Sequence, residues 1–178
     1  KTGDGAIPTG DTAVPGTDVV GVNVTLLAAL GGIGSTANFL EIDSSNRDGS
    51  LLNGVLDAQA LNGIYVTETS GNLRLKLVDS DLGDASLVTL SGSIVDGRHA
   101  TGTATDDAEI LANSIDLQAI GGSIGEVGVG GGDVEIDSSR QSVGDVGLEA
   151  KNTIYLTEVD GTLRLVQART PIAEPSAT

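Results

Sequence analysis

The sequence is poor in large and reactive side chains. It has no Cys, Met or Trp, one Phe, two Tyr and a single histidine, His99. The lack of cysteine excludes a disulfide framework, a cysteine-based zinc site and a thiol nucleophile, and one histidine excludes a multi-histidine metal centre. Compact globules usually bury much of their apolar area as aromatic rings. The chain is therefore predicted to have a thin, layered aliphatic core.

Charge and hydropathy remove two further classes of partner. The 178 residues include 25 Asp and Glu against 9 Lys and Arg, for a net charge of −16. This negative field repels phosphate backbones, so we expect no nucleic-acid binding. Apolar runs are short and interrupted, so we expect no membrane span. The sequence starts at Lys1 without an apolar signal region, and we expect it to be a piece of a larger protein whose export signal lies elsewhere.

Proline is confined to the two ends of the sequence. The stretch from Gly16 to Thr170 contains none, which favours continuous sheet because proline cannot donate a ladder hydrogen bond. We expect residues 1–17 and 169–178 to be flexible linkers or tails, and residues 18–168 to form the folded unit. The four prolines are Pro8, Pro15, Pro171 and Pro175.

Within this unit, apolar and polar residues alternate with a period of two. That period is typical of half-buried β-strands, and turn-forming pairs such as Ser70-Gly71 separate the runs. The pattern predicts an all-β chain with Val, Ile and Leu pointing inward and Thr, Asp, Arg, Lys and Tyr pointing outward. The clearest alternating runs are 22–26, 64–67, 73–77, 115–117, 134–137, 154–157 and 163–165.

The sequence also repeats itself. Residues 62–75 return at 152–165 with nine of fourteen positions identical, at an offset of 90. Glu-Ile-Asp-Ser-Ser at 41–45 returns at 135–139, at an offset of 94, and the Gly-rich segment 31–34 has an echo at 121–125. The fixed order of these blocks indicates two repeats of about 90 residues, with matching blocks over about 22–78 and 110–167.

Two architectures fit a duplicated all-β chain. One is a pair of tandem antiparallel β-sandwich modules. The other is a single parallel β-solenoid with coils of about 20–25 residues, stacked about 4.8 Å apart in some seven or eight windings. Sandwiches usually have a buried aromatic residue and proline-marked turns, which this sequence lacks. We favour the solenoid, whose two ends would be open sheet edges that need a cap or a neighbour.

The ordered blocks resemble the repeats of large bacterial exoproteins of the filamentous-haemagglutinin type. The resemblance rests on Gly-Gly-Ser-Ile-Gly at 121–125, Glu-Ile-Asp-Ser-Ser at 135–139, Asn-Thr-Ile-Tyr-Leu-Thr-Glu at 152–158 and the following Leu-Arg-Leu. It covers about 22–167. It implies a right-handed parallel β-helix, exported by two-partner secretion and displayed at the bacterial surface as an adhesive or structural fibre. The family's secretion domain with its Asn-Pro motifs has no counterpart here, so the resemblance places the chain in the repetitive shaft.

The sequence therefore predicts a structural role and no enzyme. The expected partners are neighbouring repeats or copies of the chain stacked end to end. One alternative is a module whose outer face binds a host or cell-surface glycan or protein. The other is a polysaccharide-degrading β-helix enzyme, for which Glu68 and Glu158 would be the candidate carboxylate pair. Glu68 and Glu158, with Arg74 and Arg164, are equally explained as a repeat-related ladder on the outer face.

No residue is expected to be catalytic, cofactor-binding or metal-binding. His99 is interpreted as an exposed corner residue, since no orienting partner or nucleophile lies nearby in sequence. Ca²⁺ is the one cofactor considered, because Asp79, Asp81 and Asp84 crowd oxygen ligands into six residues, although without EF-hand spacing. Asp106-Asp107 and the corner from Asp43 to Asp48 are weaker versions of that idea. Solvated corners are the favoured interpretation.

Overall fold

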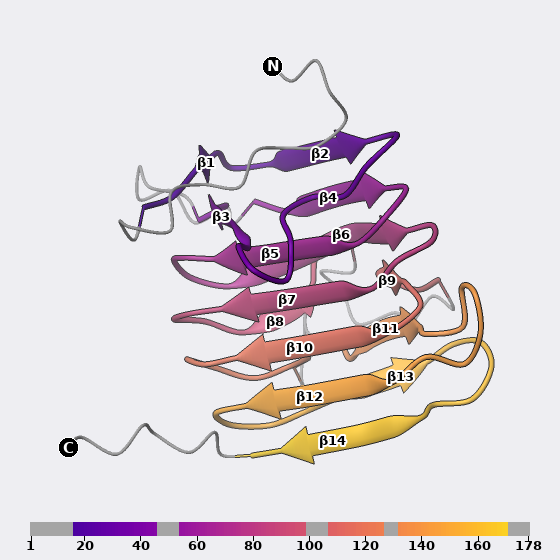
Figure 1. Cartoon of the computed structure of the whole chain (residues 1–178). Coiled ribbons are helices and arrows are strands. Elements are labelled where there is room, and N and C mark those ends of the chain that lie inside the picture. The colour runs from indigo at the N-terminus through magenta and orange to yellow at the C-terminus, as the bar shows by residue number, and fades with distance from the viewer. Residues whose placement is uncertain (1–15, 46–53, 99–106, 127–131, 171–178) are drawn as a thin grey trace.

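In the computed structural model, short strands form two parallel sheets stacked along one axis (Figure 1). The structure describes residues 16–45, 54–98, 107–126 and 132–170. Sheet A contains β1 (Val19–Val20), β3 (Leu40–Asp43), β5 (Ile64–Glu68), β7 (Ala85–Thr89), β10 (Ile115–Ala119), β12 (Val146–Ala150) and β14 (Leu165–Arg169). Sheet B contains β2 (Val24–Ala28), β4 (Leu56–Ala60), β6 (Leu73–Ser80), β9 (Ile110–Leu111), β11 (Val134–Asp137) and β13 (Leu156–Glu158), with β8 (Ile94–Asp96) also paired to β6.

The chain passes from one sheet to the other with nearly every strand. All pairs between named strands are parallel, and each sheet runs through both repeats without a break. The prediction of an all-β chain is confirmed, and this arrangement is the one expected of a β-solenoid. The alternative of two tandem antiparallel sandwiches is wrong, because both repeats contribute strands to the same two sheets.

The core is a stack of aliphatic side chains between the sheets. Strands such as β2, β4 and β12 alternate buried and more exposed residues, as the period of two predicts. The buried hydrophobic residues are all Val, Leu, Ile or Ala, so the predicted aliphatic core is confirmed for the described residues. Inward residues pair with inward residues of the next winding, as in the sheet A series Ile64, Ala85, Ile115 and Val146.

Successive windings differ widely in length. Leu56 pairs with Leu75, 19 residues later, whereas Val24 pairs with Leu56, 32 residues later. The expected 20–25 residues per coil is therefore too narrow. Strand positions stay in register while the connecting corners absorb the difference, because corner segments are far less constrained than ladder residues.

The 90-residue repeat spans three and a half windings. The block Ile-Tyr-Val-Thr-Glu forms β5 in sheet A, and its equivalent at 154–158 contributes β13 to sheet B. Between them the chain returns to sheet A three times, as β7, β10 and β12. Equivalent blocks therefore keep their local structure but lie on opposite sheets.

Local irregularities also follow the repeat. The β4–β6 pairing shifts register after Leu56, and the β12–β14 pairing shifts after Val146, 90 residues later. Gly34 and Gly125 have φ of +66° and +69°, the left-handed region that glycine tolerates best. At each, a Cβ would also overlap the carbonyl oxygen of a tyrosine in the next winding. These shared details explain why the Gly-rich segments occur in both halves.

Candidate functional site

Glu68 and Glu158, the predicted carboxylate pair, do not flank a common cleft. Glu68 ends β5 in sheet A, and Glu158 ends β13 in sheet B. The prediction that Glu68 belongs to an outer-face ladder is wrong, since its side chain is fully buried. Arg164 pairs with Asp145 on the surface.

The two glutamates instead fasten a repeated corner. Ser44 donates hydrogen bonds to Glu68 from its backbone N (3.1 Å) and from its Oγ (2.5 Å). Ser138 donates in the same way to Glu158, at 2.8 and 2.6 Å. The second serine of each Ser-Ser pair binds the Asp two residues before it, as Ser45 binds Asp43 (Oγ–Oδ1, 2.5 Å). This gives the Glu-Ile-Asp-Ser-Ser block a structural role that joins adjacent windings.

Burial changes the titration of Glu68. Removal of its carboxyl group from water raises the pKa to about 7, while the hydrogen bonds from Ser44 and Ser70 oppose this shift. In the unfolded chain the reference pKa is 4.5. The folded state therefore binds the proton more tightly, and the protonated group's contribution to stability is fully present below pH 4.5 and lost as the pH rises through 7.

We expect the Glu68→Gln variant to lose this pH dependence. From pH 4.5 to 8, the free energy of unfolding of the wild type should fall by about 3 kcal/mol relative to that of Glu68→Gln. Urea titrations at several pH values measure this difference. Glu158→Gln is the matched control, because it disturbs the equivalent Ser138 hydrogen bonds at a half-buried corner. A constant difference between wild type and Glu68→Gln would contradict the expectation.

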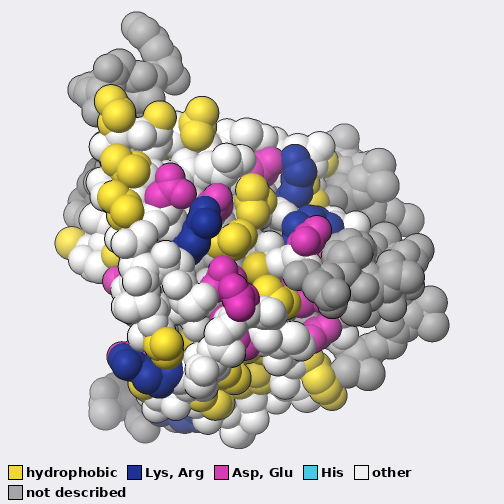
Figure 2. Space-filling model, turned by 90° about the vertical axis from the view of Figure 1, so that its right-hand side faces the viewer, with side chains coloured by type: hydrophobic (Ala, Val, Ile, Leu, Met, Phe, Trp, Pro, Cys, Tyr) yellow, Lys and Arg dark blue, Asp and Glu magenta, His cyan; other side chains and the backbone are white. Residues whose placement is uncertain are grey.

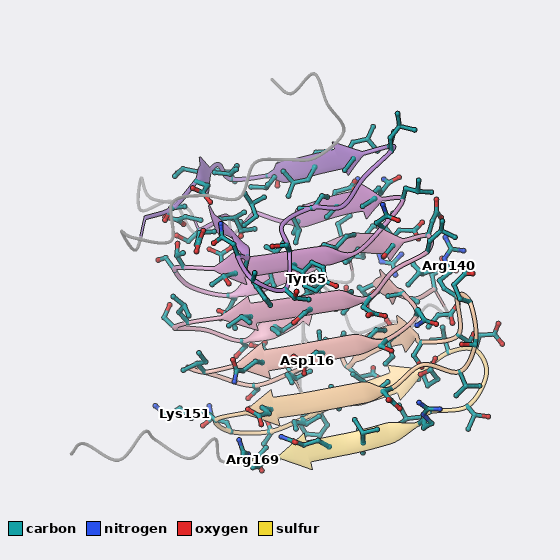
Figure 3. The ribbon with its side chains drawn as sticks, in the orientation of Figure 1. Tyr65, Asp116, Arg140, Lys151 and Arg169 are labelled. Atoms are coloured by element: carbon teal, nitrogen blue, oxygen red, sulfur yellow. The ribbon has the colours of Figure 1, made fainter. Side chains whose placement is uncertain are left out.

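Asp79, Asp81 and Asp84, the residues of the predicted Ca²⁺ corner, do not share one set of partners. Arg140 pairs with Asp79 (2.7 Å) and Asp81 (3.3 Å), whereas Asp84 Oδ1 accepts a hydrogen bond from Ser114 N (3.0 Å). Figure 3 shows Arg140 at the right-hand side of the view. The three carboxylates therefore do not gather into one site. His99, Asp106 and Asp48 lie outside the described residues.

A shallow groove of about 370 Å³ lies on the outward face of sheet A. Phe39 and Tyr65 form one wall as an edge-to-face pair with ring centroids 5.7 Å apart, and Asp116 lies two strands away (Figure 3). Partial burial raises the pKa of Asp116, and nearby Glu149 acts in the same direction. An aromatic face beside a carboxylate suits a polyhydroxyl ligand. The prediction that the outer face binds a glycan or protein stays a prediction.

The C-terminal winding exposes aliphatic residues that are buried elsewhere. Leu163 and Leu165 are 40% and 47% exposed, whereas their repeat equivalents Leu73 and Leu75 are fully buried. The difference arises because Leu73 and Leu75 are covered by β8 of the following winding. β14 pairs only with β12 among the described strands.

Three acidic side chains converge on sheet B. Asp96 ends β8, Glu109 immediately precedes β9, and Glu135 lies in β11. All three are buried, and one carboxylate oxygen from each lies within 4.8 Å of the others. Arg98 donates to Glu109 Oε1 from Nε (3.0 Å) and Nη2 (2.8 Å). Glu135 N donates to Glu109 Oε2 (2.8 Å), which holds β11 against the residue before β9.

The electrostatics of this cluster are unfavourable to three negative charges. Burial raises the pKa of Glu135 to about 8, and Glu109 is the next largest cause. Burial also raises the pKa of Glu109, against the opposing hydrogen bonds from Glu135 N and Arg98. Sequence reasoning missed this cluster, because position 135 lies one winding after positions 96 and 109 and the alternation in β11 places Glu135 on the outward face. The repeat of Glu41 at Glu135 was the only available signal.

Charged side chains on the side of the molecule in Figure 2 are intermixed, with Lys and Arg beside Asp and Glu. The described part of the chain contains no helix with the length and apolarity needed to cross a bilayer. Comparisons with family models, with curated proteins and with solved structures gave no match.

Proposed function

We propose that the chain is a rigid segment of a bacterial surface or secreted fibre, folded as a right-handed parallel β-helix and acting as a shaft or filament building block. The observation that carries this proposal is that both parallel sheets continue through the two repeats. They end at the C-terminal winding, where the aliphatic residues Leu163 and Leu165 are exposed. The right hand follows from the strong bias of parallel crossover connections.

Stiffness is what such an arrangement supplies. Hydrogen bonds between windings run along the stacking axis in two sheets at once, and the aliphatic core between them is continuous. Bending the rod would have to stretch a ladder in one sheet and shear core contacts. Ion pairs between windings add to these links, as between Lys76 and Asp57 (2.7 Å). Each exposed pair contributes little by itself.

The corners provide the variable part of the surface. Windings of 19 to 32 residues share one strand register, so insertions at corners change the outer surface without disturbing the core. The net charge of −16 keeps such surfaces soluble and mutually repelling. A fibre that presents contact loops on a constant scaffold is consistent with both features.

Copies of the chain would meet through their C-terminal windings. Leu163 and Leu165 are exposed there, whereas the inward residues of β2 at the other end are already buried. Because this contact joins two identical faces, it pairs two shaft segments end to end as a closed, twofold dimer and does not by itself extend a filament. The edge strand β14 offers backbone groups for the same contact.

We expect the chain to self-associate in a concentration-dependent way, reaching a dimer in sedimentation experiments. Leu165→Glu should shift the protein to monomer, because it places a charge in the apolar contact. Leu82→Glu is the control, since Leu82 is also exposed (56%, against 47% for Leu165) but lies at a corner before β7. A strict monomer at high concentration would contradict the proposed contact, and species beyond a dimer would favour head-to-tail stacking.

A further inference from the structure

The buried carboxylate of Glu135 lacks a complete set of partners. The side chain is 5% exposed, and its Oε2 is shielded from solvent without any hydrogen-bond donor. A buried carboxylate normally has its oxygens satisfied by donors or by a cation, because desolvation is otherwise uncompensated. Glu135 therefore faces a position where a positively charged or donor group is expected.

The geometry around Glu135 suits a metal ion. Ca²⁺ binds oxygen ligands at about 2.3–2.6 Å, so two ligands of one ion lie at most about 5 Å apart. The oxygens offered by Asp96, Glu109 and Glu135 lie within 4.8 Å of one another. The three oxygens are therefore close enough for one ion to contact them all after small side-chain adjustments.

The charges of the cluster also call for a cation. Three carboxylates meet one guanidinium, that of Arg98, which is engaged with Glu109 (2.8 Å) and with the carbonyl oxygen of Asp107. Glu135 has no cationic partner among the described residues, and its Oε2 has no hydrogen-bond donor. A fourth carboxylate, Asp133, adds to the negative potential at Glu135. A divalent ion would supply positive charge beside Glu135 while Arg98 keeps its contact with Glu109.

We propose that Asp96, Glu109 and Glu135 bind one divalent cation of the oxygen-preferring class, Ca²⁺ in particular. Ca²⁺ tolerates irregular geometry and completes its shell with water, whereas Mg²⁺ demands a near-ideal octahedron at shorter distances. The ion would tie β8, β9 and β11 together at the point where β6 pairs with both β8 and β9. The cluster is separate from the C-terminal contact, so this inference does not depend on the proposed function.

The first repeat provides a matched control. Asp18 and Glu41 occupy the positions of Glu109 and Glu135, with the same pair of backbone contacts: Asp18 N donates to Glu41 O (2.8 Å), and Glu41 N to Asp18 Oδ2 (3.3 Å). In the second repeat, Glu109 N likewise donates to Glu135 O (2.8 Å). Among the described residues, a third converging carboxylate is present only in the second repeat.

The test is calorimetric titration of the full 178-residue chain with CaCl₂ after removal of bound metal. We expect one site per chain with a dissociation constant of about 10⁻⁵–10⁻³ M. Glu135→Gln should abolish the heat, and Glu41→Gln should leave it unchanged. At saturating Ca²⁺ the melting temperature of the wild type should rise by about 5–10 °C over that in EDTA, and that of Glu135→Gln should not.

Folding of the variant is checked independently. Glu135→Gln removes a buried charge, so in EDTA it should keep the β-sheet circular dichroism of the wild type and melt no lower. The proposal is overturned by a flat titration of the wild type, by binding that survives Glu135→Gln, or by equal loss in both variants. Tighter binding of Mg²⁺ than of Ca²⁺ would overturn the choice of ion.

Discussion

Leu75→Ala should lower the free energy of unfolding by about 3–5 kcal/mol, the range for a fully buried leucine that leaves a cavity. Leu75 is buried between β4 and β8, and its side chain belongs to the continuous aliphatic core. Because windings on both sides pack against it, the core has little freedom to collapse into the space. Urea denaturation monitored by circular dichroism measures the change.

The repeat equivalent of Leu75 makes this a paired experiment. Leu165→Ala deletes the same atoms at the same place in the duplicated block, but Leu165 is half exposed. We expect a loss below about 1 kcal/mol there at protein concentrations low enough to keep the chain monomeric. Equal effects of the two substitutions would mean that the C-terminal winding is covered in solution.

Gly144→Ala should lower the free energy of unfolding by about 4 kcal/mol or more. Gly144 lies where two windings approach closely, and a Cβ there would overlap the carbonyl oxygen of Asn113. The fixed spacing of parallel strands does not allow the backbones to separate locally. Gly54, 90 residues earlier, has the same relation to the carbonyl oxygen of Val22.

Gly147→Ala is the control for this substitution. Its Cβ would lie 2.8 Å from Asp116 Oδ1, the end of a side chain on the outer face that can rotate away. We therefore expect a change below about 1 kcal/mol, measured by the same urea titration. If Gly144→Ala folded with wild-type stability, the close approach of these windings would be wrong.

The nature of the core and most strand positions were predictable from the sequence, although the predicted run at 163–165 meets β14 only at Leu165. The alternating run at 134–137 coincides with β11, and 64–67 lies within β5. A two-residue period reports which residues face inward, because side chains alternate across a strand. It carries no information on which sheet a strand joins. That depends on the corners, whose lengths follow no period, so the half-winding offset could not be predicted.

Buried acidic residues were the main failure of sequence reasoning. Glu68 shares the inward parity of the other buried residues of β5, but a charged residue next to a turn is typical of a solvated position, and the prediction gave more weight to the charge. Glu68 is buried because Ser44 of the preceding winding supplies its hydrogen-bond donors. Glu109 and Glu135 come together for a similar reason, through contacts between windings. Partners 24 and 26 residues apart leave no local signature, although the repetition of the blocks pointed to a shared structural purpose.

A duplication unit that advances the rod by a half-integral number of turns has a geometric consequence for recognition. A motif that occurs once per unit therefore lies on one side of the rod in one unit and on the opposite side in the next. A single ligand that binds two such motifs must reach around the rod. Otherwise two separate ligands bind, one on each side. Only every second unit would place the motif on the same side again. The spacing between equivalent motifs on one side of the rod is therefore twice the spacing that the sequence period suggests.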